Sequence, residues 1–112
     1  MKKVVCFIRP HRLESVKSAI SSVGVNGLSV TEVRGTGNSE ERTAWFGGEQ
    51  QLIALPIRSR IEVVVGDATV VEVLAAIIEN AHSGEEGDGK IFVEPIQDAI
   101  RIRTFERGEE AI

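Results

Sequence analysis

Residues 84–90 (GEEGDGK) have the composition of a phosphate-binding loop. They match the pattern G-x-x-x-x-G-K, in which glycines let backbone N–H groups turn toward one point and the lysine adds a positive charge. The next residue is Ile91, whereas a P-loop NTPase has a serine or threonine there to hold magnesium. The segment also follows a predicted helix and precedes a predicted strand, the reverse of P-loop order. We therefore reject the P-loop NTPase and retain two alternatives, an anion-binding loop and a flexible glycine connector.

Two further cations, Arg101 and Arg103, alternate with isoleucines in the run Ile-Arg-Ile-Arg at 100–103. A period of two predicts an extended segment with both arginines on one side. Two forked guanidinium groups and the point charge of Lys90 suit the oxygens of a polyphosphate, whereas an edge strand made soluble by charge is the alternative. Only a short turn containing Pro95 separates these cations, so we expect the tail to return beside its strand or to cross to a neighbouring subunit.

The hydrophobic pattern predicts the elements that must position these residues. Short apolar or alternating runs predict strands at 4–8, 25–33, 57–65 and 91–93. Spacings of three and four predict a first helix on Leu13, Val16, Ile20 and Val23, which Gly24 closes as a C-cap.

The second helix is predicted over 70–81. Its start carries a capping-box pattern from Thr69 to Glu72, and Gly84 closes it. The predicted apolar stripe of this helix consists of Val70, Leu74, Ile77, Ile78 and Ala81.

The resulting order, β-α-β-β-α-β, predicts one ferredoxin-like α+β domain over residues 1–112. Both helices are expected on one face of a four-stranded antiparallel sheet. The other face would expose a large apolar patch, so we expect a homo-oligomer that covers it.

Composition excludes several functions. The net charge of −4 and the lack of a basic-aromatic stripe argue against nucleic-acid binding. No segment approaches the length of a membrane span, so we expect a cytoplasmic protein without direct membrane insertion. Cys6, the only cysteine, is expected to be a buried core thiol. We interpret His11 and His82 as surface or helix-capping residues, and 85–88 equally as a solvated acidic loop or a magnesium site.

About nineteen residues, from Gly37 to Leu55, separate two strands that should be neighbours. A structureless loop of this length is usually functional or disordered. Trp45 and Phe46 could form a partner-binding anchor on it, or pack on the chain itself or a neighbour. Both alternatives make the loop an interaction element.

The chain resembles the PII signal-transduction proteins over its whole length. The resemblance rests on Val30-Thr31-Glu32-Val33-Arg34-Gly35, on Gly84 with Gly87-Asp88-Gly89-Lys90-Ile91-Phe92-Val93, on Ile100-Arg101-Ile102-Arg103-Thr104, and on Gly108-Glu109-Glu110-Ala111-Ile112. It implies a homotrimer with a T-loop (about 37–55) that docks on targets, a B-loop (about 82–90) and a C-loop (about 97–112).

The resemblance also implies that ATP or ADP binds between adjacent subunits. It assigns phosphate binding to Gly87, Gly89, Lys90, Arg101 and Arg103, and places the base and ribose near Gly35, Ser29, Glu62 and Val64. The implied nucleotide site as a whole is Ser29, Gly35, Thr36, Gly37, Glu62, Val64, Gly87, Asp88, Gly89, Lys90, Arg101 and Arg103. No protein ligand for a metal is assigned, and any magnesium would enter with the nucleotide.

The departures from the family lie almost entirely in the T-loop (about 37–55), which we also call the arm. Gln51 stands where the family usually has the uridylylated tyrosine, and the chain contains no tyrosine. Ser39 and Asn38 replace a glutamine and an arginine, and Arg58 replaces the lysine that meets the 2-oxoglutarate carboxylate. We therefore expect an intact adenylate site, weak or absent synergy with 2-oxoglutarate, and target contacts through Trp45, Phe46 and Gln51.

The implied function is a non-catalytic adenine-nucleotide sensor that regulates a transporter or an enzyme of nitrogen or carbon metabolism through its T-loop. Three alternatives stay open at this point. They are a PII-like sensor of ADP or AMP with a small anion such as bicarbonate, a weak ATPase in the same cleft, and a purely structural trimer.

Overall fold

The computed structural model describes residues 1–37, 42–46, 49–53 and 55–112, and the side chains of 1–37 and 55–112. Its strands are β1 (Lys2–Ile8), β2 (Ser29–Arg34), β3 (Arg42–Phe46), β4 (Glu49–Ile53), β5 (Ile57–Val65) and β6 (Gly89–Pro95). Its helices are α1 (Leu13–Ser22) and α2 (Val70–Ala81), with short 3-10 turns at Pro10–Arg12, Asp67–Thr69 and Gly108–Ala111.

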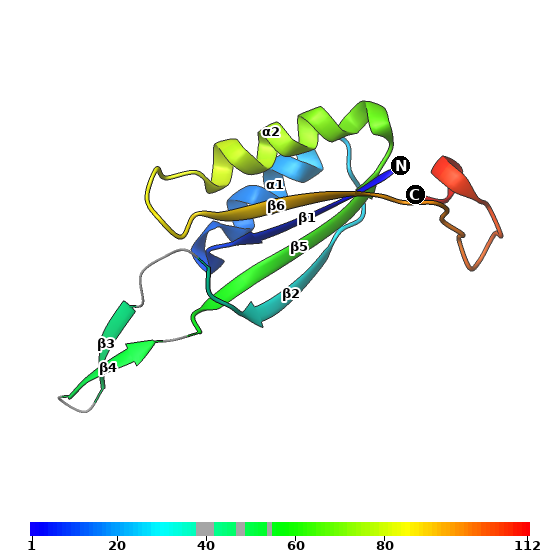
Figure 1. Ribbon diagram of the computed structural model, residues 1–112. Coiled ribbons are helices and arrows are strands. Elements are labelled where there is room, and N and C mark those ends of the chain that lie inside the picture. Colours follow the sequence, from blue (N-terminus) through cyan, green and yellow to red (C-terminus); the bar gives the residue numbers. More distant parts are fainter. Residues whose placement is uncertain (38–41, 47–48, 54) are drawn as a thin grey trace.

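Four strands form the main sheet in the order β2-β5-β1-β6, and each neighbouring pair is antiparallel. Both helices cover the same face of this sheet (Figure 1). The predicted ferredoxin-like arrangement is therefore confirmed. None of the helices in the described ranges is long and apolar enough to cross a membrane.

The core lies between the sheet and the two helices. On β5, Ser59, Ile61, Val63 and Val65 are buried in the alternating pattern that the sequence predicts. Val16 and Ile20 of α1 are fully buried against them, and the turn of Gly24 (φ 90°) closes that helix as predicted. Cys6 is the expected core thiol, and burial raises its pKa to about 11.

Two details of α2 differ from the sequence prediction. Val73 and Ala76 are buried with Ile77 and Ala81, whereas Ile78 is exposed. Apolar residues surround most of this helix, so their spacing alone does not identify the buried face. The capping box does not form either, because Thr69 already has a right-handed helical conformation at the end of a 3-10 turn and its side chain caps nothing.

The strands also differ in length from their predictions. β2 begins at Ser29 rather than Val25, and β6 extends from Gly89 to Pro95 because it pairs with β1 along its whole length. The arm between β2 and β5 is not structureless, since it contains the antiparallel hairpin of β3 and β4. This hairpin leaves the end of the main sheet (Figure 1).

The tail after β6 differs most from its sequence prediction. Residues 101–104 form a turn rather than an extended segment, and the backbone N–H of Phe105 donates to the carbonyl of Arg101 at 2.8 Å. An isolated bridge between Ile100 and Arg107 closes this turn. The alternation of arginine and isoleucine therefore does not place both arginines on one side of a strand.

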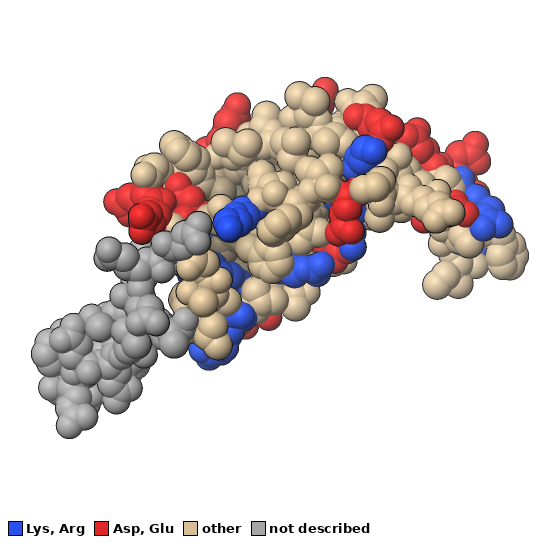
Figure 2. Space-filling model, viewed as in Figure 1, with Lys and Arg blue, Asp and Glu red and all other residues tan. Residues whose placement is uncertain are grey.

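The open face of the sheet is mixed rather than apolar. Lys3 forms ion pairs with Glu62 at 3.1 Å and Glu94 at 3.4 Å, while Arg60 pairs with Glu62 at 2.9 Å. On the side shown in Figure 2, acidic and basic side chains intermingle and do not form one basic surface. A partner on the open face would therefore need polar groups as well as apolar ones.

Candidate functional site

Two clefts lie near opposite ends of the main sheet. The first, of about 580 Å³, is bordered by residues 33–37 after β2 and by residues 85–90 at the start of β6, and we call it the loop cleft. The second, of about 780 Å³, is bordered by the ends of β2 and β5 and by the tail, and we call it the tail cleft. Figure 1 shows the loop before β6 and the tail after it at opposite ends of the molecule.

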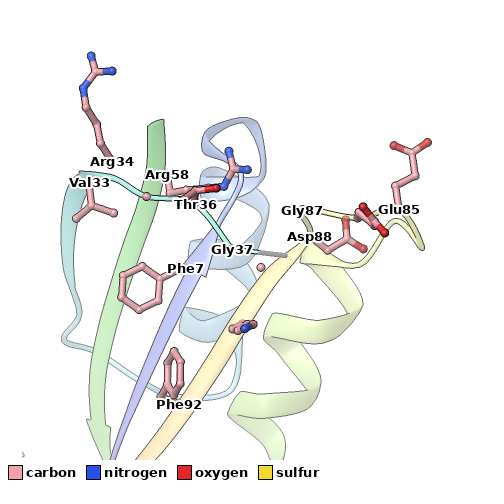
Figure 3. Close-up of a pocket in the computed structure, with 14 residues that line it drawn as sticks. Phe7, Val33, Arg34, Thr36, Gly37, Arg58, Glu85, Gly87, Asp88 and Phe92 are labelled. Atoms are coloured by element: carbon pink, nitrogen blue, oxygen red, sulfur yellow. The ribbon is translucent and has the colours of Figure 1, made fainter. Parts of the chain in front are cut away.

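The loop cleft has an aromatic floor. Phe7 of β1 and Phe92 of β6 lie on the open face of the sheet, where their rings meet edge to face at a centroid distance of 6.2 Å (Figure 3). Arg60 lies over the Phe7 ring, with 6.0 Å between its Cζ and the ring centroid. The cleft therefore combines a flat apolar surface with the polar backbone of the loop.

Backbone geometry requires glycine at two positions of the loop. Gly87 and Gly89 have φ of 92° and 115°, a region that side chains rarely adopt. At Gly89 a Cβ would also collide with the backbone carbonyl oxygen of Phe7. Only glycine allows the loop to enter β6 this close to β1, and a bare backbone of this kind can approach a phosphate.

Three cations border the loop cleft: Lys90, Arg58 and Arg34. Arg34 points away from the cleft in Figure 3, and its Nη1 donates to the Leu55 carbonyl at 3.5 Å. A Cβ at Gly87 would lie 3.7 Å from Nη2 of Arg58, so this guanidinium reaches the loop. Lys90 and Arg58 thus supply positive charge beside the glycines.

The side chain of Asp88 holds the loop together. Its carboxylate accepts hydrogen bonds from the backbone N–H groups of Ser83 (2.7 Å) and Gly84 (3.0 Å) and from the Ser83 hydroxyl (2.5 Å). Arg9 Nη1 lies 3.4 Å from the same carboxylate. The bonds from Ser83, then those from Gly84, with the charge of Arg9, lower the pKa of Asp88 to about 2.

The tail cleft has a different chemistry. Ser29, Glu62 and Val64 border it from the sheet, and Arg101 and Ile112 border it from the tail. The hydrogen bond from Lys3, with a further contribution from Arg60, holds the pKa of Glu62 below its usual value. This cleft therefore offers an ionised carboxylate and a guanidinium on either side of an apolar strand end.

The predicted site residues divide between the two clefts. The loop cleft contains Gly35, Thr36, Gly37, Arg58, Gly87, Asp88, Gly89 and Lys90, and the tail cleft contains Ser29, Glu62, Val64 and Arg101. Arg103 is exposed on the tail turn and borders neither of these two clefts. Because the seven residues of β6 span about 20 Å, Lys90 and the two arginines do not meet within one chain.

Several predictions fall on residues that the structure does not cover. Ser39 lies outside the described residues, and so do the side chains of Trp45, Phe46 and Gln51. Within the covered part of the chain, no group of three or more His, Cys, Asp and Glu side chains is arranged to hold a metal ion.

The sequence reasoning missed three residues of the loop end. Phe7 and Phe92 form the floor of the cleft, and their period-two positions on two strands were the available signal. Arg9 contacts the loop from the end of β1, and no local pattern relates it to residues more than seventy positions away.

The family model for "Nitrogen regulatory protein P-II" matches residues 1–106. Proteins of that name from Azospirillum brasilense and Haemophilus influenzae are 41% and 42% identical to the chain over 112 residues, which is the whole length of both partners in each comparison. "Nitrogen regulatory protein P-II 2" from Methanothermobacter thermautotrophicus is 42% identical over the whole chain and 97% of its own length.

Proposed function

We propose that this chain, which belongs to the nitrogen regulatory protein P-II family, is a signal-transduction protein that senses ATP or ADP between the subunits of a homotrimer. It regulates a protein target through its arm and carries out no catalysis. By the names of its relatives, the regulated process belongs to nitrogen metabolism, and a link to carbon metabolism is the wider alternative.

The observation that carries this proposal is the division of the candidate site into two complementary halves at opposite ends of the main sheet. The loop cleft has glycine backbone and Lys90 for phosphates, and the tail cleft has Glu62, Ser29 and Arg101 for polar groups of a nucleoside and its phosphates. A closed ring of subunits can bring the tail of one chain to the loop of the next. One nucleotide would then contact both halves.

The arm is connected to the ligand through the chain itself. The chain leaves β2 after Arg34, passes Gly37 into the arm, and re-enters the main sheet at Ile57, next to Arg58; both Gly37 and Arg58 border the loop cleft. A ligand that moves either residue acts on a chain segment that leads into or out of the hairpin of β3 and β4. This connection gives bound nucleotide a route to bias the conformation that the arm presents to a target.

Binding of ATP and ADP tests the proposed site. We expect both nucleotides to bind, and Lys90→Ala to weaken ATP binding roughly 10- to 100-fold through loss of charge-assisted hydrogen bonds. Titration calorimetry measures this effect. Lys17→Ala is the matched control, because Lys17 lies on α1 and pairs with Glu14 away from both clefts. The absence of binding at millimolar ATP and ADP would remove the proposal.

A second titration tests the response to the effector 2-oxoglutarate. Because Arg58 presents a planar fork where a lysine is usual and Ser39 replaces a glutamine, we propose weak or absent synergy between ATP and 2-oxoglutarate. Adding magnesium and 2-oxoglutarate should leave ATP affinity nearly unchanged, and strong synergy would contradict this part of the proposal.

A further inference from the structure

We propose that Ser83, Asp88 and Arg9 form a clamp that holds residues 83–90 in their ligand-binding shape before a ligand arrives. In this arrangement Asp88 is a positioning residue and not a ligand of phosphate or magnesium. The inference rests on the proposed function, since it concerns the same phosphate loop, and it changes the role that the sequence assigns to Asp88.

The carboxylate of Asp88 is already fully engaged. Oδ2 accepts the backbone N–H groups of Ser83 and Gly84, and Oδ1 accepts the Ser83 hydroxyl and faces Arg9. The side chain is 20% exposed. To bind a metal ion in the cleft, Asp88 would have to give up these contacts, which close residues 83–88 into a ring.

Arg9 ties this ring to the rigid sheet. It follows β1, its side chain is only 12% exposed, and its Nη2 donates to the carbonyl oxygen of Glu86 at 2.6 Å. Nη1 donates to the Ser83 hydroxyl at 3.3 Å. One guanidinium therefore holds both the beginning and the middle of the loop relative to the strand that pairs with β6.

The hydroxyl of Ser83 is the centre of the clamp. It donates to Asp88 and accepts from Arg9 and from the backbone N–H of Glu85 at 3.2 Å. Neither Ser83 nor Arg9 borders the loop cleft. Of the three clamp residues only Asp88 borders the cleft, and its carboxylate is bonded to Ser83 and Gly84 and lies beside Arg9.

A clamp of this kind matters because glycine loops lose more conformational entropy on ordering than other segments. If the loop is ordered in advance, phosphate binding does not have to pay for that ordering. The clamp should therefore contribute to affinity even though it makes no contact with the ligand.

The test compares Ser83→Ala with Ser83→Thr, because threonine keeps the hydroxyl. We expect Ser83→Ala to weaken ATP binding about tenfold and Ser83→Thr to restore it to within about threefold. Without nucleotide, amide hydrogen exchange over 83–88 should be faster in Ser83→Ala than in the wild type and Ser83→Thr, and saturating ATP should remove the difference. Wild-type affinity and wild-type exchange in Ser83→Ala would overturn the clamp.

Magnesium separates the clamp from a metal-ligand role. With Asp88→Asn, the clamp predicts the same loss of ATP affinity in magnesium and in EDTA, whereas a loss confined to magnesium would make Asp88 a metal ligand and overturn the proposal. If the wild-type chain binds neither ATP nor ADP, the proposed function fails. Hydrogen exchange of the free chains then still decides whether the clamp exists.

Discussion

The two ends of β6 are built in opposite ways. Before the strand, the loop is held by side chains that are largely covered and by Gly89, which lies against the backbone of β1. After the strand, the tail presents Ile102 and Phe105, which are 91% and 80% exposed, and its Arg107–Asp98 ion pair lies in solvent. The loop end is held by contacts within its own chain. The tail end leaves large apolar side chains exposed, as a surface that binds a neighbouring subunit would.

This difference indicates which half of the site a single chain can organise alone. Exposed ion pairs contribute little to stability, so the tail depends on whatever covers it. The positive φ of Phe105 (64°) is a strained conformation for an aromatic residue, and it lies in the same turn as Arg101 and Arg103. We expect the loop to keep its structure in isolated subunits, and the tail to depend on the proposed assembly.

The largest expected effect compares one glycine from each end. Gly89→Ala introduces a Cβ that collides with the Phe7 carbonyl at a φ of 115°, and we expect it to reduce the free energy of unfolding by about 3 kcal/mol or more. Gly108→Ala also strains a positive φ but meets no atom within 4 Å, so we expect a loss of about 1 kcal/mol. Chemical denaturation measures both, and equal losses would contradict the contrast between the ends.

The next effect tests whether the two ends of different chains form one site. We expect Lys90→Ala and Arg101→Ala each to weaken ATP binding by roughly 10-fold or more. When the two variants are unfolded, mixed equally and refolded, random trimers should regain strong binding at about a quarter of their sites, where an intact loop meets an intact tail.

The control for this experiment mixes Lys90→Ala with the double variant that lacks both side chains. No arrangement of these chains joins an intact loop to an intact tail, so strong binding should not return. No recovery in the experiment would show that the site lies within one chain, whereas recovery in the control would show that strong binding does not require Lys90.

The smallest expected effect concerns one carboxylate from each end. Because Asp88 and Asp98 both have lowered pKa values, each stabilises the fold above the ordinary aspartate pKa, and this stability is lost as the pH falls through the folded-state pKa. We expect Asp88→Asn to lower the melting temperature more than Asp98→Asn at neutral pH. The difference between wild type and Asp88→Asn should shrink between about pH 4 and pH 2, and a constant difference would contradict this assignment.

The sequence predicted the fold most reliably in segments whose apolar pattern corresponds to one buried face. The core lies between one sheet face and two helices, and this arrangement accounts for three confirmed predictions. They are the alternation of buried residues on β5, the helix that buries Val16 and Ile20, and the buried Cys6. Prediction failed where several conformations satisfy the same pattern. Arg101 and Arg103 alternate as they would in a strand, yet the bond from Phe105 to the Arg101 carbonyl closes a turn.

The candidate site was predictable in its residues more than in its geometry. Glycines and Lys90 predict an anion-binding loop from composition alone. The support of that loop depends on Arg9, which is distant in sequence and reaches it through the pairing of β1 with β6. Local patterns contain no information about such contacts. The positioning role that we propose for Asp88 therefore rests on the hydrogen bonds of its carboxylate and not on its sequence neighbours.

The span of β6 also has a consequence for how binding should be measured. A strand of about 20 Å separates the two halves of the site, so the proposed ligand contacts both only when two chains are already together. Mass action then makes nucleotide affinity depend on the concentration of the protein as well as that of the ligand. In a dilution series, ATP would appear to bind more weakly as the subunits separate, and saturating ATP would delay their separation.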